Sequence, residues 1–328
     1  MNLKEAFEQF VEELKLDPDE RDEAIAAHLQ LRDVLADADV ASTAILQGSF
    51  ARKTMLPPLK DIDLVAFLNS IHEHLKDAPG GSDSAMDLIE KAIIDEYDNP
   101  TFDRSAHALR VDLGSGFTFD VVPGFDTDTD LIWIADRDDD RFELSDTRRV
   151  TAAVQQRNQD CNGLFVHQIR MIKQWMRHTL SDDIPGFVGE CIAYAVITKA
   201  LSHARACTRV FSEGADLVAN GDVAVPESDE NVLDRLTEGQ ITALHDALID
   251  ARDRALEAAG LAGAGDDAGA IDLWHQVFGD PFPEAPKQTV EETFSKLVGI
   301  GGGVTSTLRG TTAASRHNQT PSTRAWAP

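Results

Sequence analysis

The first part of the chain alternates between helical and extended patterns of apolar residues. Apolar positions recur at helical spacing from Leu3 to Leu14 and from Asp19 to Ala36, which predicts two helices that pack behind the elements after them. A β-prone run from Ser42 to Gln47 is followed at Gly48 by a predicted turn segment that Pro57 and Pro58 close. The apolar run from Ile62 to Leu68 then predicts a buried strand.

Two further patterns extend this predicted first lobe. The stretch from Ser82 to Tyr97 is typical of an amphipathic helix, with Ser82 or Asp83 as its N-cap. Apolar and polar residues alternate in Ala108 to Leu113 and in Phe117 to Val122, on either side of Gly114-Ser115-Gly116, and this predicts a β-hairpin. Asp112 and Asp120 then fall on its two arms.

From about Val150 the pattern changes to long helical runs. We expect helices at 163–180, 187–204 and 232–259, with loops at 213–230 and 260–269. Residues 299–328 show no periodicity and carry Arg309, Arg316 and Arg324 without any acidic residue, so this segment is either a solvated terminus or a contact for phosphate or a partner. The sequence therefore predicts an α+β fold with a core at 1–160, a helical lobe at 161–298 and a flexible basic tail at 299–328.

Charge and cysteine content narrow the function. The chain holds 57 Asp and Glu against 30 Lys and Arg, a formal net charge of −27, which disfavours a long nucleic acid as partner and favours small nucleotides. A solubility adaptation to a salty cytoplasm would explain the same acidity. The three cysteines predict buried free thiols, not disulfides or a zinc site. A charged N-terminal segment and the lack of long apolar runs predict a cytoplasmic protein with no membrane contact.

The residues with the clearest chemistry are Gly48-Ser49 and the pair Asp61 and Asp63 at the start of the buried strand. Gly48 leaves room for a phosphate near the backbone, and the Ser49 hydroxyl can donate to phosphate oxygens. Two carboxylates that lie two residues apart on a strand leave the same face, where they can share hard cations. A third acid from a neighbouring strand would complete the site.

Asp120 in the hairpin is the expected third ligand, and Asp112 on the other arm is its main rival. Three such carboxylates can hold two Mg²⁺ ions, with Mn²⁺ as an alternative, one ion activating a hydroxyl and the other holding a triphosphate. Taken alone, an Asp-x-Asp pair in so acidic a chain is more often a solvated strand edge. The combination with the Gly-Ser turn and the later acid predicts a metal-dependent nucleotidyltransferase.

The run GSFARKT followed by DIDLVAFL, FDVVPGF and IRMIKQW resembles the polymerase-β-like nucleotidyltransferases, within which it is most similar to the bacterial CD-NTases. That superfamily includes cyclic GMP-AMP synthase, oligoadenylate synthetase and the archaeal CCA-adding enzymes. The resemblance covers about residues 40–200. It implies a mixed-sheet lobe, a helical lobe and an active site in the cleft between them.

The resemblance also implies roles for single residues. Asp61, Asp63 and Asp120 match the metal ligands, Gly48 and Ser49 match the phosphate-binding turn, and Lys173 matches a helix lysine that contacts the triphosphate. Arg52 and Lys53 can neutralise phosphate or lie on the surface as turn residues. The implied activity is synthesis of a cyclic di- or trinucleotide second messenger in antiphage (CBASS-type) defence, with ATP favoured and a regulatory protein on the helical lobe or tail.

Three alternatives stay open at the level of sequence: addition of CCA to tRNA, synthesis of linear oligoadenylate, and a catalytically silent nucleotide-binding scaffold. The segment from Ile184 to Glu190 departs from the family pattern for the nucleotide pocket, so we expect Phe187 and Glu190 to be core or capping residues. His72 and His74 lack a third ligand at a suitable spacing, which predicts surface histidines.

Overall fold

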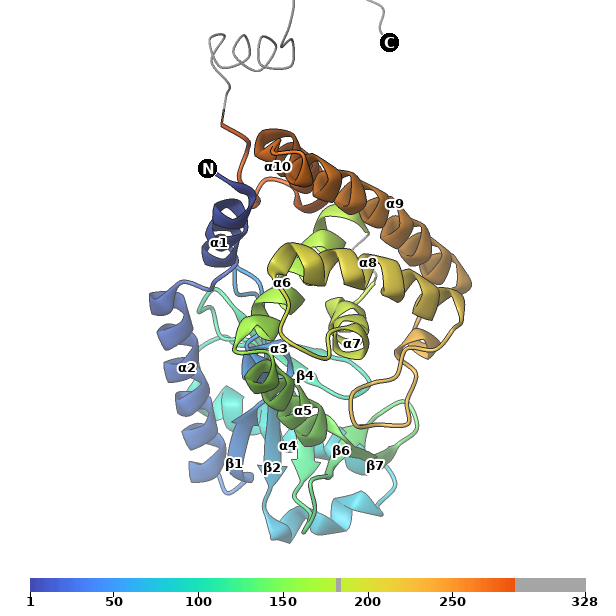
Figure 1. The fold of residues 1–328 in the computed structure, drawn as a ribbon. Coiled ribbons are helices and arrows are strands. Elements are labelled where there is room, and N and C mark those ends of the chain that lie inside the picture. Colours follow the sequence, from blue (N-terminus) through green and yellow to red (C-terminus); the bar gives the residue numbers. More distant parts are fainter. Residues whose placement is uncertain (181–183, 287–328) are drawn as a thin grey trace, which may run out of the picture. The chain divides into compact units, whose positions relative to one another are not determined.

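A mixed β-sheet and a group of long helices make up the part of the chain that the structure, a computed structural model, describes: residues 1–180 and 184–286 (Figure 1). Residues 1–285 form one compact unit. The predicted basic tail at 299–328 and the last part of the predicted helical lobe lie outside the described residues. Sheet and helices together confirm the predicted α+β class.

The sheet has one parallel pair at its centre. Its strands are β1 (Ala41–Leu46), β2 (Asp61–Leu68), β3 (Thr101–Arg104), β4 (Leu109–Asp112), β5 (Thr118–Phe125), β6 (Ile132–Asp136) and β7 (Arg141–Ser145). They follow the order β1-β2-β5-β4-β3, with β6 paired to β5 and β7 to β6. Strands β2 and β5 run parallel, and every other pair is antiparallel. The antiparallel pair β4–β5 confirms the predicted hairpin.

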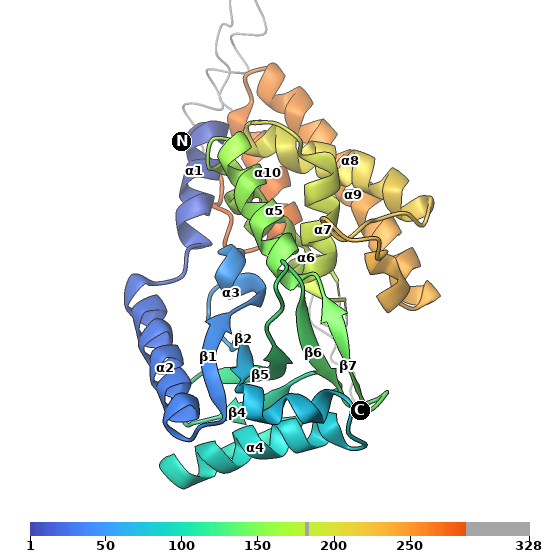
Figure 2. The same ribbon diagram turned by 90° about the horizontal axis from the view of Figure 1, so that it is seen from below.

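Alternation along β2 decides which face carries chemistry. Ile62 and Leu64 point into a core with Leu31 of α2 (Pro18–Asp37) and Ile89 of α4 (Gly81–Glu96), which cover this face of the sheet together with η1 (Ser70–Lys76). Figure 2 shows α2 and α4 on this side. Neighbouring residues of a strand point to opposite faces of the sheet. The side chain of Asp63 therefore projects from the face that α2 and α4 do not cover.

The helical part begins with α5 (Thr147–Asp160) and α6 (Leu164–Thr179). It continues with α7 (Gly186–Val196), α8 (His203–Ala219), η2 (Val232–Arg235), α9 (Glu238–Gly263) and α10 (Asp267–Phe278). The first helix, α1 (Leu3–Glu13), joins the same core. The helical core therefore draws on residues from both sides of position 160.

Aromatic side chains fasten α1 to α10. The ring of Phe7 meets Trp274 edge-on at 5.1 Å, and the ring of Phe10 lies 4.7 Å from that of Phe278. Each such pair contributes about 0.5–1.5 kcal/mol beyond the area it buries. The cluster places α1, and with it the start of the α1–α2 connection, beside the helices that follow the sheet.

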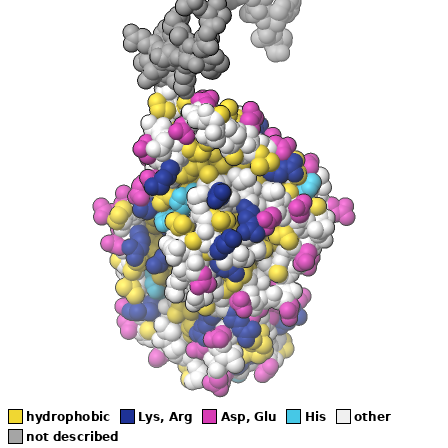
Figure 3. All heavy atoms as spheres, viewed as in Figure 1, with side chains coloured by type: hydrophobic (Ala, Val, Ile, Leu, Met, Phe, Trp, Pro, Cys, Tyr) yellow, Lys and Arg dark blue, Asp and Glu magenta, His cyan; other side chains and the backbone are white. Residues whose placement is uncertain are grey.

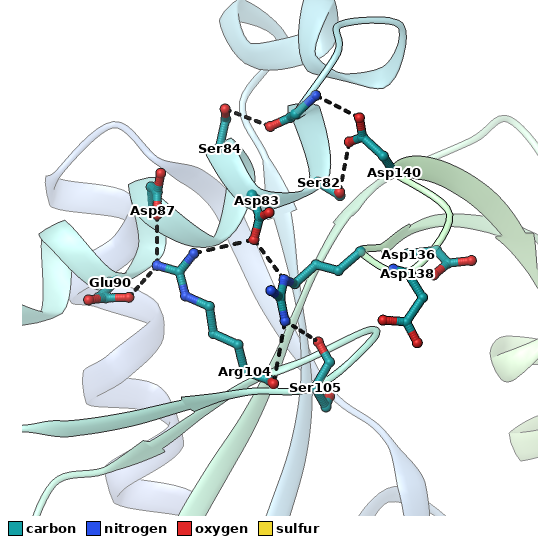
Figure 4. Close-up of polar contacts among 12 residues, drawn as sticks. Ser82, Asp83, Ser84, Asp87, Glu90, Arg104, Ser105, Asp136, Asp138 and Asp140 are labelled. Atoms are coloured by element: carbon teal, nitrogen blue, oxygen red, sulfur yellow. Dashed lines mark hydrogen bonds and ion pairs between the residues drawn. The ribbon is translucent and has the colours of Figure 1, made fainter.

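Helix α4 shows why one predicted cap is wrong. Its N-cap is Gly80, and Ser82 is a buried residue inside the helix. The carboxylate of Asp140, from the β6–β7 turn, accepts hydrogen bonds from the Gly80 backbone N–H at 2.8 Å and from the Ser82 hydroxyl at 3.3 Å (Figure 4). Asp140, which lies 60 residues after Gly80, satisfies the backbone N–H at the helix start, so the local pattern could not reveal this cap.

The same helix is held to the sheet edge by charge. Arg104 of β3 contacts the carboxylates of Asp87, Glu90 and Asp83, and Arg137 donates to Asp83 at 2.6 Å (Figure 4). Exposed ion pairs contribute little one at a time, about 0–1 kcal/mol, and more when several share one network. This network fixes α4 across the sheet face opposite the aspartates.

Three predicted boundaries in the helical part differ from the structure. The predicted helix 187–204 ends at Val196, and a new helix, α8, runs from His203 to Ala219, into the predicted loop at 213–230. The long helix begins at Glu238 and continues to Gly263, beyond the predicted end at 259. Its start follows from a capping box, in which the Thr237 hydroxyl accepts from the Gln240 N–H and the Gln240 side chain accepts from the Thr237 N–H.

Predictions about cysteines and membrane contact can also be compared with the structure. Cys161, Cys191 and Cys207 are free and buried, as predicted. Within residues 1–180 and 184–286, no helix combines the length and the apolar composition that crossing a membrane requires. His72 and His74 lie in η1 at the surface of the protein. A ring nitrogen of His72 contacts the Asp39 carbonyl, and a ring nitrogen of His74 contacts the Ile71 carbonyl.

Candidate active site

The three predicted aspartates line one cavity of about 450 Å³. In the parallel pair β2–β5, Asp63 lies directly beside Asp120, and Asp61 lies beside Thr118. Asp61 and Asp63 are two residues apart on one strand, so they share a face. The register of two parallel strands therefore brings together residues that are far apart in the sequence.

The carboxylates of Asp61 and Asp120 already have partners from the sheet. The Thr118 hydroxyl donates to Asp61 at 2.7 Å. Arg110 on β4 donates to both oxygens of Asp120, from Nε and from Nη2, each at 2.8 Å, and lies 3.6 Å from Asp61. These paired hydrogen bonds to Asp120 raise the pKa of the Arg110 guanidinium. Arg110 thus supplies the positive charge that the acids on this face of the sheet require.

Sequence analysis missed Arg110, although the hairpin pattern contained the signal. A hairpin centred on Ser115 places Arg110 opposite Asp120, and this is the register that the structure shows. Opposite charges that face each other across two strands attract. The same register pairs Asp112 with Thr118, and its carboxylate accepts from the Gly114 N–H at 2.7 Å. Asp112, the predicted rival ligand, is not among the described residues that line the cavity.

Asp63 is partly buried and forms no ion pair with the described residues. Burial raises the pKa of its carboxyl, the negative charge of Asp120 raises it further, and Arg52 and Lys173 oppose the shift. A hard cation with oxygen ligands would relieve this repulsion, so the donor set fits Mg²⁺ or Mn²⁺ in chemical type. In the described residues no three His, Cys, Asp or Glu side chains are arranged to hold a metal ion.

Gly48 opens a one-turn helix, α3 (Gly48–Arg52), where the sequence predicted a turn segment. The helix is short because Gly48 enters at a φ of +60° and Lys53 leaves it in the left-handed conformation at a φ of 60°. A Cβ on Gly48 would lie 1.7 Å from Oδ2 of Asp63. The glycine is therefore required by the close approach of α3 to the buried aspartate, and Ser49 beside it lines the cavity.

A buried ion network forms one wall of the cavity and joins the sheet to the helices. The Glu190 carboxylate on α7 is 2% exposed and accepts from Arg52 Nε at 2.9 Å, from the Thr54 hydroxyl at 2.8 Å and from Lys173 Nζ at 3.0 Å. Burial alone would raise the pKa of Glu190, but the charges of Lys173 and Arg52 outweigh it and lower the pKa. Arg52 is thus a buried residue of the cavity wall, not a surface turn residue.

The segment 184–190, where the sequence departs from the family pattern, contributes Pro185, Gly186, Phe187 and Glu190 to the cavity lining. Glu190 is buried as predicted but holds two cations and caps no helix. Phe187 is only partly buried, and its ring lies 5.0 Å from the Arg52 guanidinium carbon. A Cβ on Gly186 would lie 2.9 Å from Cε of Lys173. The glycine therefore lets α7 approach α6 closely enough for Glu190 to reach Lys173.

Two more cations of the cavity were not predicted. Arg177 lies four residues after Lys173 on α6, on the same side of the helix, and donates to the Pro57 carbonyl at 2.8 Å. Lys60 precedes Asp61 and also lines the cavity. The spacing from Lys173 to Arg177 was the signal available in the sequence. Lys53, in contrast, is exposed and lines a different cavity on the far side of α3.

Comparison with known families matches residues 1–158 to the Second Messenger Oligonucleotide or Dinucleotide Synthetase domain. This match agrees with the resemblance found in the motifs. Comparison with the curated proteins finds no match.

Solved structures share the fold across most of the chain. The complex of Escherichia coli CdnC with HORMA matches at a TM-score of 0.68 and 19% identity, over 85% of this chain and 98% of that one. The Vibrio cholerae DncV cyclic AMP-GMP synthase, solved with the linear intermediate pppA(3′,5′)pG, matches at 0.67 and 14% identity, over 85% and 98%. The CdnE c-di-GMP synthase of Capnocytophaga granulosa matches at 0.61 and 14% identity, over 76% and 83%. These likenesses confirm the predicted polymerase-β-like fold.

Proposed function

Since residues 1–158 match the model of the second messenger oligonucleotide or dinucleotide synthetase domain, we propose that this chain joins nucleoside triphosphates into a cyclic di- or trinucleotide. ATP is the favoured substrate, the reaction takes place in the cytoplasm, and its product serves antiphage (CBASS-type) defence. One observation carries the proposal: Asp61, Asp63 and Asp120 share one face of the sheet and one cavity with several cations.

The reaction forms one bond and breaks another. A ribose hydroxyl oxygen of one nucleotide attacks the α-phosphorus of a second, the bond to pyrophosphate breaks, and the hydroxyl proton passes to solvent. A second transfer within the linear product closes the ring. Positioning and neutralisation of charge supply most of the rate enhancement in this kind of transfer.

Asp61, Asp63 and Asp120 would hold the divalent cations, which activate the hydroxyl and stabilise the negative charge on the triphosphate. The high pKa of Asp63 supports this role, because a carboxylate crowded by other acids gains most from a cation. Arg110 holds Asp120 by both oxygens and so keeps the third ligand on the cavity side of the hairpin.

The triphosphate is held by groups around α3 and α6. Ser49 donates its hydroxyl, while Lys173 and Arg177 place positive charge on the opposite wall. Lys173 contacts Glu190 at 3.0 Å, so part of its charge is neutralised until a phosphate competes for it. Arg52 stays paired with Glu190 and acts by fixing the wall, and Lys53 does not contribute to this cavity.

The test is product formation. Purified protein is incubated with radiolabelled nucleoside triphosphates and Mg²⁺ or Mn²⁺ and then treated with phosphatase. We expect a phosphatase-resistant product that disappears in Asp61→Asn and persists in Asp112→Asn, a matched change on the same sheet but outside the cavity. Because CdnC was solved with HORMA, a regulatory protein that binds the helical lobe or the tail is part of the proposal, and the assay is repeated in its presence. Absence of product under all of these conditions contradicts the proposal.

A further inference from the structure

A second cavity, on the far side of α3 from the aspartates, is lined by basic side chains. It has a volume of about 490 Å³ and lies between the α1–α2 connection, α2, α3 and α6. Its charged residues are Lys15, Arg21, Lys53 and Arg170, and none of the described residues that line it is acidic. We call it the basic cavity. In a chain with a net charge of −27, four converging cations require an explanation.

Acidic partners do not account for these cations. Lys15 pairs with Glu12 at 2.6 Å, but in the described part of the chain no carboxylate forms an ion pair with Arg21, Lys53 or Arg170. Arg170 is the most enclosed of them, and burial lowers the pKa of its guanidinium. A partly buried cation without a counter-charge is costly, and an anion that binds there would offset the cost. On the face drawn in Figure 3, acidic side chains are spread along the outline of the molecule, and Lys and Arg side chains lie in smaller groups among the other side chains.

Apart from His167, the rest of the lining of the basic cavity is apolar. Leu16, Ile25 and Met55 line it, and the buried ring of Phe50 forms part of its wall. Ligand pockets of about 300–1,000 Å³ combine an apolar lining with a few placed polar groups. A ligand that satisfies both parts carries negative phosphates and a flat, largely apolar ring. We propose that the basic cavity binds a small phosphorylated nucleotide, at a site separate from the aspartate cavity.

Ligand binding here would reach the aspartate cavity through two short connections. Arg170 Nε donates to the Lys53 carbonyl at 3.0 Å and so ties the end of α3 to α6. Arg52 and Lys173 both hold Glu190. Arg52 lies next to Lys53 in the sequence, and Lys173 lies about one turn after Arg170 on α6. Through these contacts a ligand in the basic cavity would influence synthesis in the aspartate cavity, which rests on the proposed function.

The experiment measures binding and needs no catalysis. Isothermal titration in EDTA uses ATP, cyclic di-AMP and tripolyphosphate as probes, so that substrate, product type and phosphate alone are compared. The variant Arg21→Gln with Lys53→Gln changes two exposed side chains of the basic cavity, and Lys173→Gln changes the aspartate cavity. Arg32→Gln, on α2 but outside both cavities, is the matched control.

We expect at least one nucleotide probe to bind about tenfold or more weakly to the basic-cavity variant, since each charged contact to phosphate is worth about that factor. Its binding to Arg32→Gln should stay within about twofold of wild type, and Lys173→Gln should weaken only the ATP binding that belongs to the aspartate cavity. Unchanged binding to the basic-cavity variant overturns the proposal, and equal binding of tripolyphosphate and nucleotides overturns its nucleotide part. A short RNA duplex that binds in place of the small probes, and loses binding in the same variant, would assign the cavity to nucleic acid instead.

Binding and synthesis fail in distinguishable ways. If the probes do not bind in the basic cavity, the proposal of a second site fails and the product assay still tests synthesis. If no product forms, the proposed function fails and the titration still tests binding in the basic cavity. Hydrogen exchange of residues 15–21 and 167–170 gives an independent measurement, because a ligand in the basic cavity should slow exchange there even if the variants change affinity for another reason.

Discussion

Replacing Glu190 with glutamine tests whether the buried network supports the fold as well as the active site. Glu190 accepts hydrogen bonds from Arg52, Thr54 and Lys173, which come from both parts of the molecule. Gln keeps the volume and one acceptor oxygen, so the change removes charge and little else. Two cations, one 7% and one 14% exposed, are left without their counter-charge.

The expected cost follows from the burial of the network. Breaking a buried ion pair by removing one partner costs about 3–5 kcal/mol. The retained acceptor oxygen and the access of Lys173 to the cavity place Glu190→Gln at the lower end, about 3 kcal/mol. In a domain of this size that corresponds to a decrease of about 6 °C in melting temperature.

The pH dependence gives the sign of the effect. The pKa of Glu190 is lower in the folded chain than its ordinary value of 4.5, because Lys173 and Arg52 outweigh the effect of burial. The group therefore contributes stability above pH 4.5 that is lost as the pH falls through the lower folded value. The difference in unfolding free energy between wild type and Glu190→Gln should be largest near pH 7 and shrink below pH 4.5.

Urea denaturation followed by circular dichroism at several pH values measures this difference. Glu213→Gln is the control, because Glu213 pairs with Arg209 on the surface at 2.6 Å and its loss should cost at most about 0.5 kcal/mol. If Glu190→Gln unfolds like this control at pH 7, the network does not stabilise the fold and our reasoning is wrong.

Three further changes address the aspartates. Gly48→Ala should abolish product formation and lower the urea midpoint, because its Cβ would lie 1.7 Å from Asp63 Oδ2; Gly114→Ala, also at positive φ but with open space around it, should keep activity. Asp63→Asn should raise the melting temperature of metal-free protein at pH 7, because burial and Asp120 raise the pKa of Asp63, and should abolish product; a lower melting temperature contradicts this. Arg110→Ala should weaken Mn²⁺ binding measured by electron paramagnetic resonance, because Asp120 loses the two hydrogen bonds that keep it on the cavity side, at a stability cost of at most about 1 kcal/mol; tighter binding would show that Arg110 competes with the metal for Asp120.

The sheet and the place of the aspartates could be predicted because their signals are local. A continuous apolar run identified β2, alternation identified the β4–β5 hairpin, and a spacing of two residues put Asp61 and Asp63 on one face. Their meeting with Asp120 needs the parallel register of β2 and β5, which no local pattern contains. The sequence predicted Asp120 only as an acid on a neighbouring strand that matches a ligand of the family.

Long-range contacts explain what the sequence did not reveal. Glu190 was predicted as a core or capping residue because its partners Arg52 and Thr54 lie on α3 and just after it, far away along the chain. The cap of α4 by Asp140 was missed for the same reason. Arg110 is the exception, because the hairpin register alone would have placed it opposite Asp120.

The parallel pairing of β2 and β5 has an evolutionary consequence. Alignment of Asp63 with Asp120 depends on backbone hydrogen bonds between these two strands, and a slip of one residue would turn Asp120 to the opposite side. Closing a longer loop between them costs little additional entropy. The turns between the elements of the crossover at residues 69–117 can therefore lengthen while Asp63 and Asp120 stay aligned.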